Sequence, residues 1–243
     1  MFKLNDKLVI DFTPYVDKDS LLTLKPYLDY AIIKNIEYQV PAQYAGYLLL
    51  DKGTGFHDVT PEFRQNLIEK YPYLINLSYK ELLLWLRYTL DIIYGQSHLA
   101  IISARTWEGK HLRENSDVTN TTESFRPFLD WLDQQNIFSN YGRITIFLNE
   151  PNCFTPIHFD PPYPDVSPKD EFIWITLDNR KRFFIIDNDT QEKTYIQGYV
   201  GTFDNHNYHG SEPSNYANWS LRVDGVFSDS FLLKTDLYNH FRG

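Results

Sequence analysis

The chain has 243 residues with 23 basic and 32 acidic side chains, a net charge of −9 and an isoelectric point near 5.2. Its length and 42% hydrophobic content suit a protein with a buried core, and its acidic balance argues against non-specific binding to nucleic acids or anionic membranes. The single cysteine, Cys153, and a start without an apolar signal segment predict a reducing, cytoplasmic location. No apolar run approaches the roughly 18 residues that a membrane span needs.

Glycine is sparse, at 11 residues, and neither a GxGxxG nor a GxxxxGK[ST] string occurs, which argues against the common nucleotide-binding loops. No cysteine pair and no HExxH string occurs either. Histidines and carboxylates are therefore the only candidates for metal ligands.

The first 140 residues show mainly helical patterns. Thr60-Pro61 predicts the start of one helix, and the capping box at Ser78–Glu81 predicts a second, buried helix that ends near Gly95. His98–Ala104 is expected to form a strand, and the polar stretch Arg105–Asn120 a long loop. A third helix is expected to begin near 121–124, because its apolar residues share one helical face: Phe125, Phe128, Leu129 and Leu132.

After Gly142 the apolar pattern changes to a period of two. Short segments rich in β-branched and aromatic residues alternate with turn residues, which predicts an antiparallel sandwich or barrel. We therefore predict an α+β, mainly β protein of one domain over 1–243, in which 1–140 is a helical flank that buttresses a β core at 141–230. The expected strands are Arg143–Asn149, Phe172–Leu177, Arg182–Asp187, Lys193–Ile196, Tyr199–Phe203 and Trp219–Phe227.

Three residues of this β half have the spacing of a metal site. His158 and Asp160 point the same way on an extended backbone, and His209 follows 51 residues after His158. Two histidines and one carboxylate occupy one face of an octahedral metal and leave the other positions open, as in non-haem Fe(II) oxygenases. His206 is the alternative late ligand, but the Phe-Asp lead and the following glycine favour His209.

Arg222 lies in an alternating strand, on the face that it shares with Ser220 and Asp224. A buried arginine needs an anionic partner, because burying an unpaired charge is costly. We therefore expect an anionic partner beside Arg222.

This pattern, over about 140–228, resembles the Fe(II)- and 2-oxoglutarate-dependent oxygenases, which are built on a double-stranded β-helix of the jelly-roll or cupin type. The run Thr155-Pro156-Ile157-His158-Phe159-Asp160, followed by Lys181, resembles Jumonji-C hydroxylases. The approach Gly201-Thr202-Phe203-Asp204 to His209, followed by Arg222, is more similar to aspartyl/asparaginyl β-hydroxylases. The first 140 residues resemble neither branch.

The resemblance implies Fe(II) held by His158, Asp160 and His209, with 2-oxoglutarate as cosubstrate and O₂ as oxidant. Arg222 is the expected anchor of the cosubstrate's distal carboxylate, because its planar fork binds a carboxylate in two places. Lys181 is the alternative anchor, or a solvated charge in the basic turn Arg180–Arg182. Asn149 and Thr155 are further candidates for hydrogen bonds to the cosubstrate.

The resemblance also implies hydroxylation of a C–H bond, with a protein or peptide side chain as the leading substrate and a small molecule as the alternative. The segments Pro161–Asp165 and Arg105–Asn120 are candidates for substrate contact, the latter as a lid. Two other functions remain open. A non-redox cupin enzyme could use the same ligands with zinc or manganese, and an aromatic-rich β-sandwich could bind carbohydrate without them.

Overall fold

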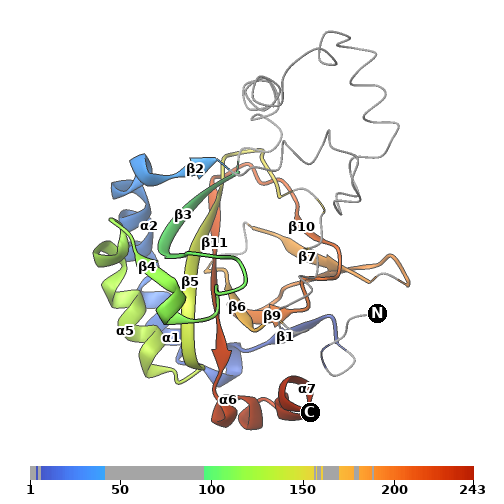
Figure 1. The fold of residues 1–243 in the computed structure, drawn as a ribbon. Helices are drawn as coiled ribbons and strands as arrows, with labels where there is room; N and C mark the ends of the chain where they lie inside the picture. Colours follow the sequence, from blue (N-terminus) through green and yellow to red (C-terminus); the bar gives the residue numbers. More distant parts are fainter. Residues whose placement is uncertain are drawn as a thin grey trace, which may run out of the picture.

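The computed structural model describes residues 4, 7–41, 96–155, 157, 160, 170–177, 181–187 and 189–243. In this part of the chain two antiparallel β-sheets pack against each other, and helices cover the far face of the larger sheet (Figure 1). The larger sheet has the strand order β1-β9-β6-β11-β5-β3-β2, with β4 paired to β3, and the smaller has the order β10-β7-β8. The strands are β1 (Val9–Asp11), β2 (Val40–Pro41), β3 (Gln96–Ala104), β4 (Ser116–Val118), β5 (Phe138–Asn149), β6 (Phe172–Ile175), β7 (Phe183–Ile186), β8 (Lys193–Tyr195), β9 (Val200–Phe203), β10 (His209–Ser211) and β11 (Asn218–Phe227).

Helices precede, interrupt and follow these strands. Helix α5 confirms the helix expected after residue 121: a proline occupies its first turn, and its apolar face packs into the core below the larger sheet. The sequence pattern did not predict the other helices, of which α2 is the longest at ten residues. The helices are α1 (Lys18–Thr23), α2 (Lys25–Lys34), α5 (Arg126–Gln134), α6 (Asp229–Lys234) and α7 (Tyr238–Arg242), with 3-10 turns η1 (Thr13–Tyr15), η2 (Ile36–Tyr38), η5 (Arg113–Asn115) and η6 (Thr122–Phe125).

The two faces of the larger sheet have different surroundings because successive side chains of a strand point to opposite faces. One face, with Ile146 and Leu221, packs against the helices in the main hydrophobic core. The other face turns toward the smaller sheet, where Phe172, Trp174 and Phe203 pack against Phe183 of β7. We call the space between the two sheets the barrel interior.

The predicted strands of the second half are confirmed, with shifts of one or two residues at most ends and an earlier start for β5. From β5 to β11 the chain passes back and forth between the sheets: β6 and β9 lie in the larger sheet, and β7, β8 and β10 in the smaller. Strand β10, which contains His209, was expected to be a turn. Its sequence, His-Gly-Ser, contains none of the Val, Ile, Thr, Phe, Tyr or Trp residues that mark the predicted strands.

The stretch Arg105–Asn120 was predicted to be a long loop, and two short elements interrupt it. It contains η5 and β4, and Lys110 within it is only 1% exposed. The main chain of Arg143 donates to the carbonyl of Lys110 at 2.7 Å. A Cβ at the neighbouring Gly142 would lie 2.4 Å from that carbonyl oxygen, so the segment packs tightly against β5. The loop prediction missed these two elements because contacts made by distant residues order this polar segment.

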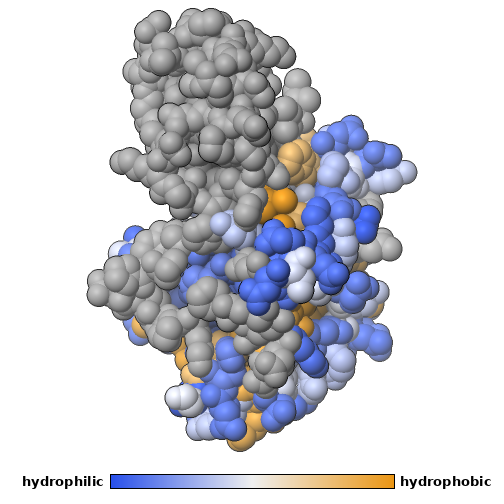
Figure 2. Space-filling view, turned by 90° about the vertical axis from the view of Figure 1, so that its right-hand side faces the viewer, coloured by the Kyte–Doolittle hydropathy of each residue, from blue (hydrophilic) through white to orange (hydrophobic). Residues whose placement is uncertain are grey.

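The helices expected from Thr60 and from Ser78, and the segment Pro161–Asp165, lie outside the described residues. None of the helices within the described ranges is long and apolar enough to cross a membrane. Hydrophilic side chains dominate the described part of the face in Figure 2, with apolar side chains in smaller groups between them.

Candidate functional site

His209, the predicted late metal ligand, begins strand β10 and faces the barrel interior. It is buried, and its ring lies 5.8 Å from that of Phe183 and 5.3 Å from that of Phe203 between centroids. Its Nδ1 lies 2.9 Å from the carbonyl oxygen of Asn207. A carbonyl can only accept a hydrogen bond, so Nδ1 donates, and a neutral His209 ring then carries its lone pair on Nε2. This is the tautomer in which a histidine binds a metal through Nε2.

Asp160, the predicted carboxylate ligand, is hydrogen-bonded to Asn205 in the connection between β9 and β10. Its main-chain N–H donates to the carbonyl of Asn205 at 2.9 Å, and the Asn205 Nδ2 donates to its Oδ2 at 2.7 Å. The structure therefore brings Asp160 to the turn that leads into His209.

His158, the third predicted ligand, lies outside the described residues. Among the residues that are described, no group of three or more His, Cys, Asp or Glu side chains is arranged to hold a metal ion. The complete triad therefore stays a prediction. His206, the rival of His209, pairs through Nδ1 with Asp204 at 2.7 Å, and this hydrogen bond raises the pKa of His206.

Arg222 is buried on β11, and carboxylates of its own chain surround its guanidinium group. Nε and Nη2 both lie 2.8 Å from Asp224, Nη1 lies 3.2 Å from Oδ2 of Asp160, and Nη2 lies 3.3 Å from Asp170. Its Cζ also lies 3.9 Å from the ring centroid of Phe172. The anion expected beside this arginine is therefore supplied by protein carboxylates.

Two more bases complete this cluster, which we call the ion cluster: Lys110, Arg143 and Arg222 with Asp160, Asp170 and Asp224. Lys110 Nζ lies 2.7 Å from Asp170, and Arg143 Nε lies 2.7 Å from Asp224. Burial opposes ionisation of Asp170, but the hydrogen bond from His111 and the charges of Arg222 and Lys110 outweigh it and hold its pKa far below the ordinary value.

No sequence pattern predicted a role for Asp170, Arg143 or Asn205. Lys110 was predicted only as part of the candidate lid. No local pattern joins these residues, since Lys110 and Asp170 are 60 positions apart.

Lys181, just before β7, is a buried lysine that forms no ion pair with a carboxylate of the described residues. It is 3% exposed, so its interpretation as a solvated charge is wrong. Its Nζ lies 3.4 Å from the carbonyl oxygen of Phe147 and 5.8 Å from the ring centroid of Trp174. No carboxylate of the described residues forms an ion pair with it, and burial lowers the pKa of Lys181 to about 7.

Polar groups without partners lie on the larger sheet's inner face, near the carbonyl that Lys181 contacts. Both side-chain amide atoms of Asn149 and the Oγ of Ser220 are buried without a hydrogen bond in the described chain. Ser220 is directly opposite Phe147 in the sheet. Thr155 is buried as well, and its Oγ1 accepts from Gln96 at 2.9 Å. Because folded proteins leave few buried polar atoms unpaired, these groups fit a polar ligand.

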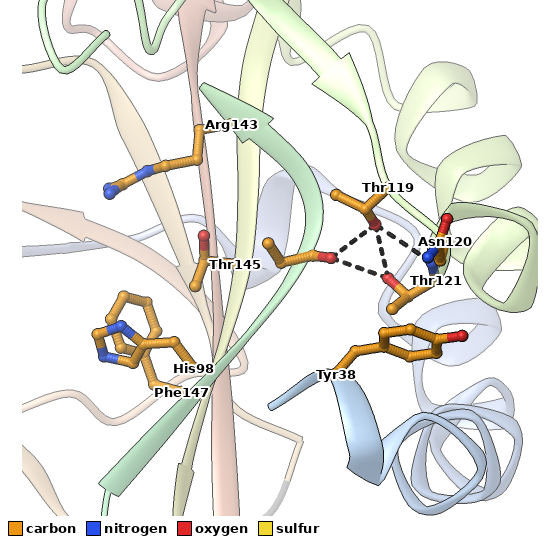
Figure 3. A pocket seen from close by; sticks show the side chains of 9 residues that line it. Tyr38, His98, Thr119, Asn120, Thr121, Arg143, Thr145 and Phe147 are labelled. Carbon is orange, nitrogen blue, oxygen red and sulfur yellow. Dashed lines mark hydrogen bonds between the residues drawn. The ribbon is translucent and has the colours of Figure 1, made fainter. Parts of the chain in front are cut away.

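A pocket of about 510 Å³ opens on the same face of the larger sheet, over β3 and β5 (Figure 3). Phe147 forms part of its wall, and its ring packs against those of His98, at 4.7 Å, and Trp174, at 5.2 Å. The pocket therefore adjoins the barrel interior. Its lining residues are Tyr38, His98, Ala100, Thr119, Asn120, Thr121, Arg143, Thr145 and Phe147.

No family model matches the chain, and no curated protein sequence matches it. Among solved structures, it is similar to a 2OG-Fe(II) oxygenase family oxidoreductase from Burkholderia pseudomallei, with 14% identity over 53% of this chain and 67% of the other and a TM-score of 0.37. A Pseudomonas putida prolyl-4-hydroxylase shares 10% identity over 92% and 94% of the two chains, with a TM-score of 0.46. An RmlC-like cupin protein from Desulfovibrio desulfuricans shares 13% over 37% and 73%, with a TM-score of 0.26.

Proposed function

We propose that this protein is an Fe(II)- and 2-oxoglutarate-dependent oxygenase that hydroxylates a C–H bond, with a protein or peptide side chain as its substrate. In such a reaction one oxygen atom of O₂ enters the substrate as a hydroxyl group. The other enters 2-oxoglutarate, which leaves as succinate and CO₂. The observation that carries the proposal is Lys181, a buried amine that forms no ion pair with a described carboxylate, in the barrel interior that also contains His209.

The proposed metal ligands are His158, Asp160 and His209, and the described ones fit that role. His209 Nδ1 is engaged by the carbonyl of Asn207, so Nε2 is the ring nitrogen that would bind the metal. Asn205 and Arg222 both contact Oδ2 of Asp160 and so orient this carboxylate. Bound iron would supply the capacity to activate O₂, while these residues would hold the metal and set its position. The two sheets would be the halves of a double-stranded β-helix.

We place the distal carboxylate of 2-oxoglutarate at Lys181 rather than at Arg222. Three protein carboxylates already engage the guanidinium group of Arg222, and displacing them would leave buried charges unpaired. Lys181 has no such competitor among the described residues, and a carboxylate beside its ammonium group would offset the cost of burying that charge. The amide of Asn149 and the hydroxyl of Thr155 are the proposed hydrogen-bonding partners of the cosubstrate.

The direct test is whether the purified protein, given Fe(II), ascorbate and O₂, converts 2-oxoglutarate to succinate. We expect turnover by the wild type and by the matched control Lys193→Met, whose side chain is 40% exposed on the same small sheet. We expect none from His209→Ala or Asp160→Ala. Anaerobic addition of Fe(II) and 2-oxoglutarate should also produce a weak visible charge-transfer band that these two variants lack.

Two results would replace the proposal with another function. Tight zinc binding with neither succinate nor the visible band would favour a non-redox metal enzyme of the cupin type. Binding of a sugar without any metal would favour a carbohydrate-binding module.

A further inference from the structure

The pocket over β3 and β5 differs in charge from the protein as a whole. The chain has a net charge of −9, yet the described residues that line this pocket include no aspartate or glutamate, and Arg143 is the charged side chain among them. Figure 3 shows Arg143 and Thr145 projecting from β5, with His98 and Phe147 farther along the same face. The local field therefore favours an anion where the surface at large repels one.

Arg143 is the base of the ion cluster that reaches the pocket. Its side chain is 17% exposed, against 1% for Lys110 and 5% for Arg222. The Nε of Arg143 donates to Asp224, and the Cζ of Arg143 lies 4.7 Å from the ring centroid of Trp107. Its two Nη atoms form no hydrogen bond with any described residue. The far edge of the guanidinium group is thus available to a ligand, while Asp224 and Trp107 fix its orientation.

The charge count of the ion cluster supports an anionic ligand. Three bases face three carboxylates, one of which, Asp160, is the proposed metal ligand. A divalent cation at Asp160 would share that carboxylate with Arg222 and so would leave the bases of the cluster less fully balanced. Of its bases, Arg143 is the one placed to meet an anion entering from the pocket.

We propose that this pocket is the substrate site and that it binds a carboxylate-bearing substrate, with the carboxylate on the Nη edge of Arg143 beside the hydroxyl of Thr145. This inference rests on the proposed function for calling the ligand a substrate. The rings of Phe147 and His98 supply an apolar wall for the carbon chain, and Tyr38, 42% exposed, stands at the rim. A volume of about 510 Å³ holds a side chain with its adjoining main chain. The carboxylate could be an acidic side chain or a free α-carboxylate.

Binding of small probes to the full-length protein, measured by calorimetry, tests the inference. The probes are N-acetyl-aspartate N-methylamide for an acidic side chain, N-acetyl-alanine for a free α-carboxylate, and N-acetyl-asparagine N-methylamide as the neutral control. At least one acidic probe should bind about tenfold more tightly than the neutral one, since hydrogen bonds to charged groups are stronger than neutral ones. The tighter acidic probe identifies the source of the carboxylate.

Variants then assign that preference to Arg143. Arg143→Gln should abolish it, whereas Arg105→Gln, which removes an equal charge from a 58% exposed side chain, should retain it. Because Arg143→Gln also takes a partner from buried Asp224, Ala100→Leu provides a second test. This substitution narrows the pocket without touching the ion cluster, and it should weaken binding of all three probes. It therefore tests the location of the site even if Arg143→Gln fails to fold.

Equal binding of the acidic and neutral probes, or a preference that survives Arg143→Gln, would overturn the inference. So would displacement of a bound acidic probe by 2-oxoglutarate, because the pocket would then be the cosubstrate site. Failure of the proposed function looks different: the acidic probe would still bind through Arg143, but the protein would form no succinate from 2-oxoglutarate.

Discussion

Replacing Lys181 by methionine should stabilise the protein and at the same time abolish binding of 2-oxoglutarate. The wild-type side chain has a buried ammonium group whose described surroundings include the Phe147 carbonyl and the Trp174 ring, and no carboxylate forms an ion pair with it. Methionine has a similar length and no charge, so it can fill the same space. A residue that lowers the stability of the free protein but is needed to bind a ligand is typical of a binding site.

The size and pH dependence of the stability change follow from the pKa of Lys181. Burial lowers this pKa from 10.5 to about 7. Below pH 7 the folded and unfolded states both hold the proton, and the full cost of the buried charge is present. Between pH 7 and 10.5 the folded state has lost the proton while the unfolded state keeps it, so stability rises with pH. The cost is about 4 kcal/mol at pH 7 and about 2 kcal/mol at pH 9.

Urea denaturation of both proteins at pH 7 and at pH 9 measures this effect. The stability advantage of Lys181→Met over the wild type should shrink by about 2 kcal/mol between the two pH values. Lys193→Met, with its exposed side chain, should show no comparable change. An advantage that does not vary with pH would show that the Lys181 ammonium group is not desolvated.

Cosubstrate binding provides the second half of the test. A carboxylate beside Lys181 returns its pKa toward the ordinary value, so the complex takes up a proton. At pH 8 the free protein, with a pKa of about 7, is mostly neutral at this lysine, and uptake should be about 0.9 proton per 2-oxoglutarate. Calorimetry with Mn(II), in buffers of different ionisation enthalpy, measures that number. Unchanged cosubstrate affinity in Lys181→Met would refute the assignment of the anchor.

Three further predictions concern the ion cluster and the proposed metal site. Arg222→Met should cost about 3 to 5 kcal/mol in urea denaturation because it leaves buried carboxylates short of a partner; unchanged stability with lost 2-oxoglutarate binding would make Arg222 the anchor instead. Asn205→Ala should weaken metal binding about 10- to 100-fold in a chelator competition, since Asn205 orients Asp160, and an unchanged affinity would count against that role. Lys110→Met should destabilise the protein by about 3 kcal/mol and speed tryptic cleavage within 105–120, whereas Arg105→Gln should cost less than about 1 kcal/mol; equal effects would mean that the segment is not held by its buried lysine.

The sequence by itself determined the elements with a local signal. Apolar residues recur with a helical period in α5 and with a period of two in β11, so both elements can be predicted without tertiary contacts. The HxD string and the late histidine were likewise found from spacing alone. Helix α5 and strand β11 follow from periodic patterns of neighbouring residues, which the sequence contains locally. Strand β10 has no such local signal, because its sequence, His-Gly-Ser, contains no β-branched residue and no Phe, Tyr or Trp.

Only the tertiary structure decided which inward cation forms no ion pair with a described carboxylate. In sequence, Arg222 looked like an unpaired cation on an inward face, and Lys181 like a solvated charge in a basic turn. The fold reverses this, because it brings Asp160 and Asp170, 62 and 52 positions away, onto Arg222, while the packing of the two sheets buries Lys181 without a carboxylate. Ion pairing and desolvation depend on residues that are distant along the chain, so no local pattern contains them.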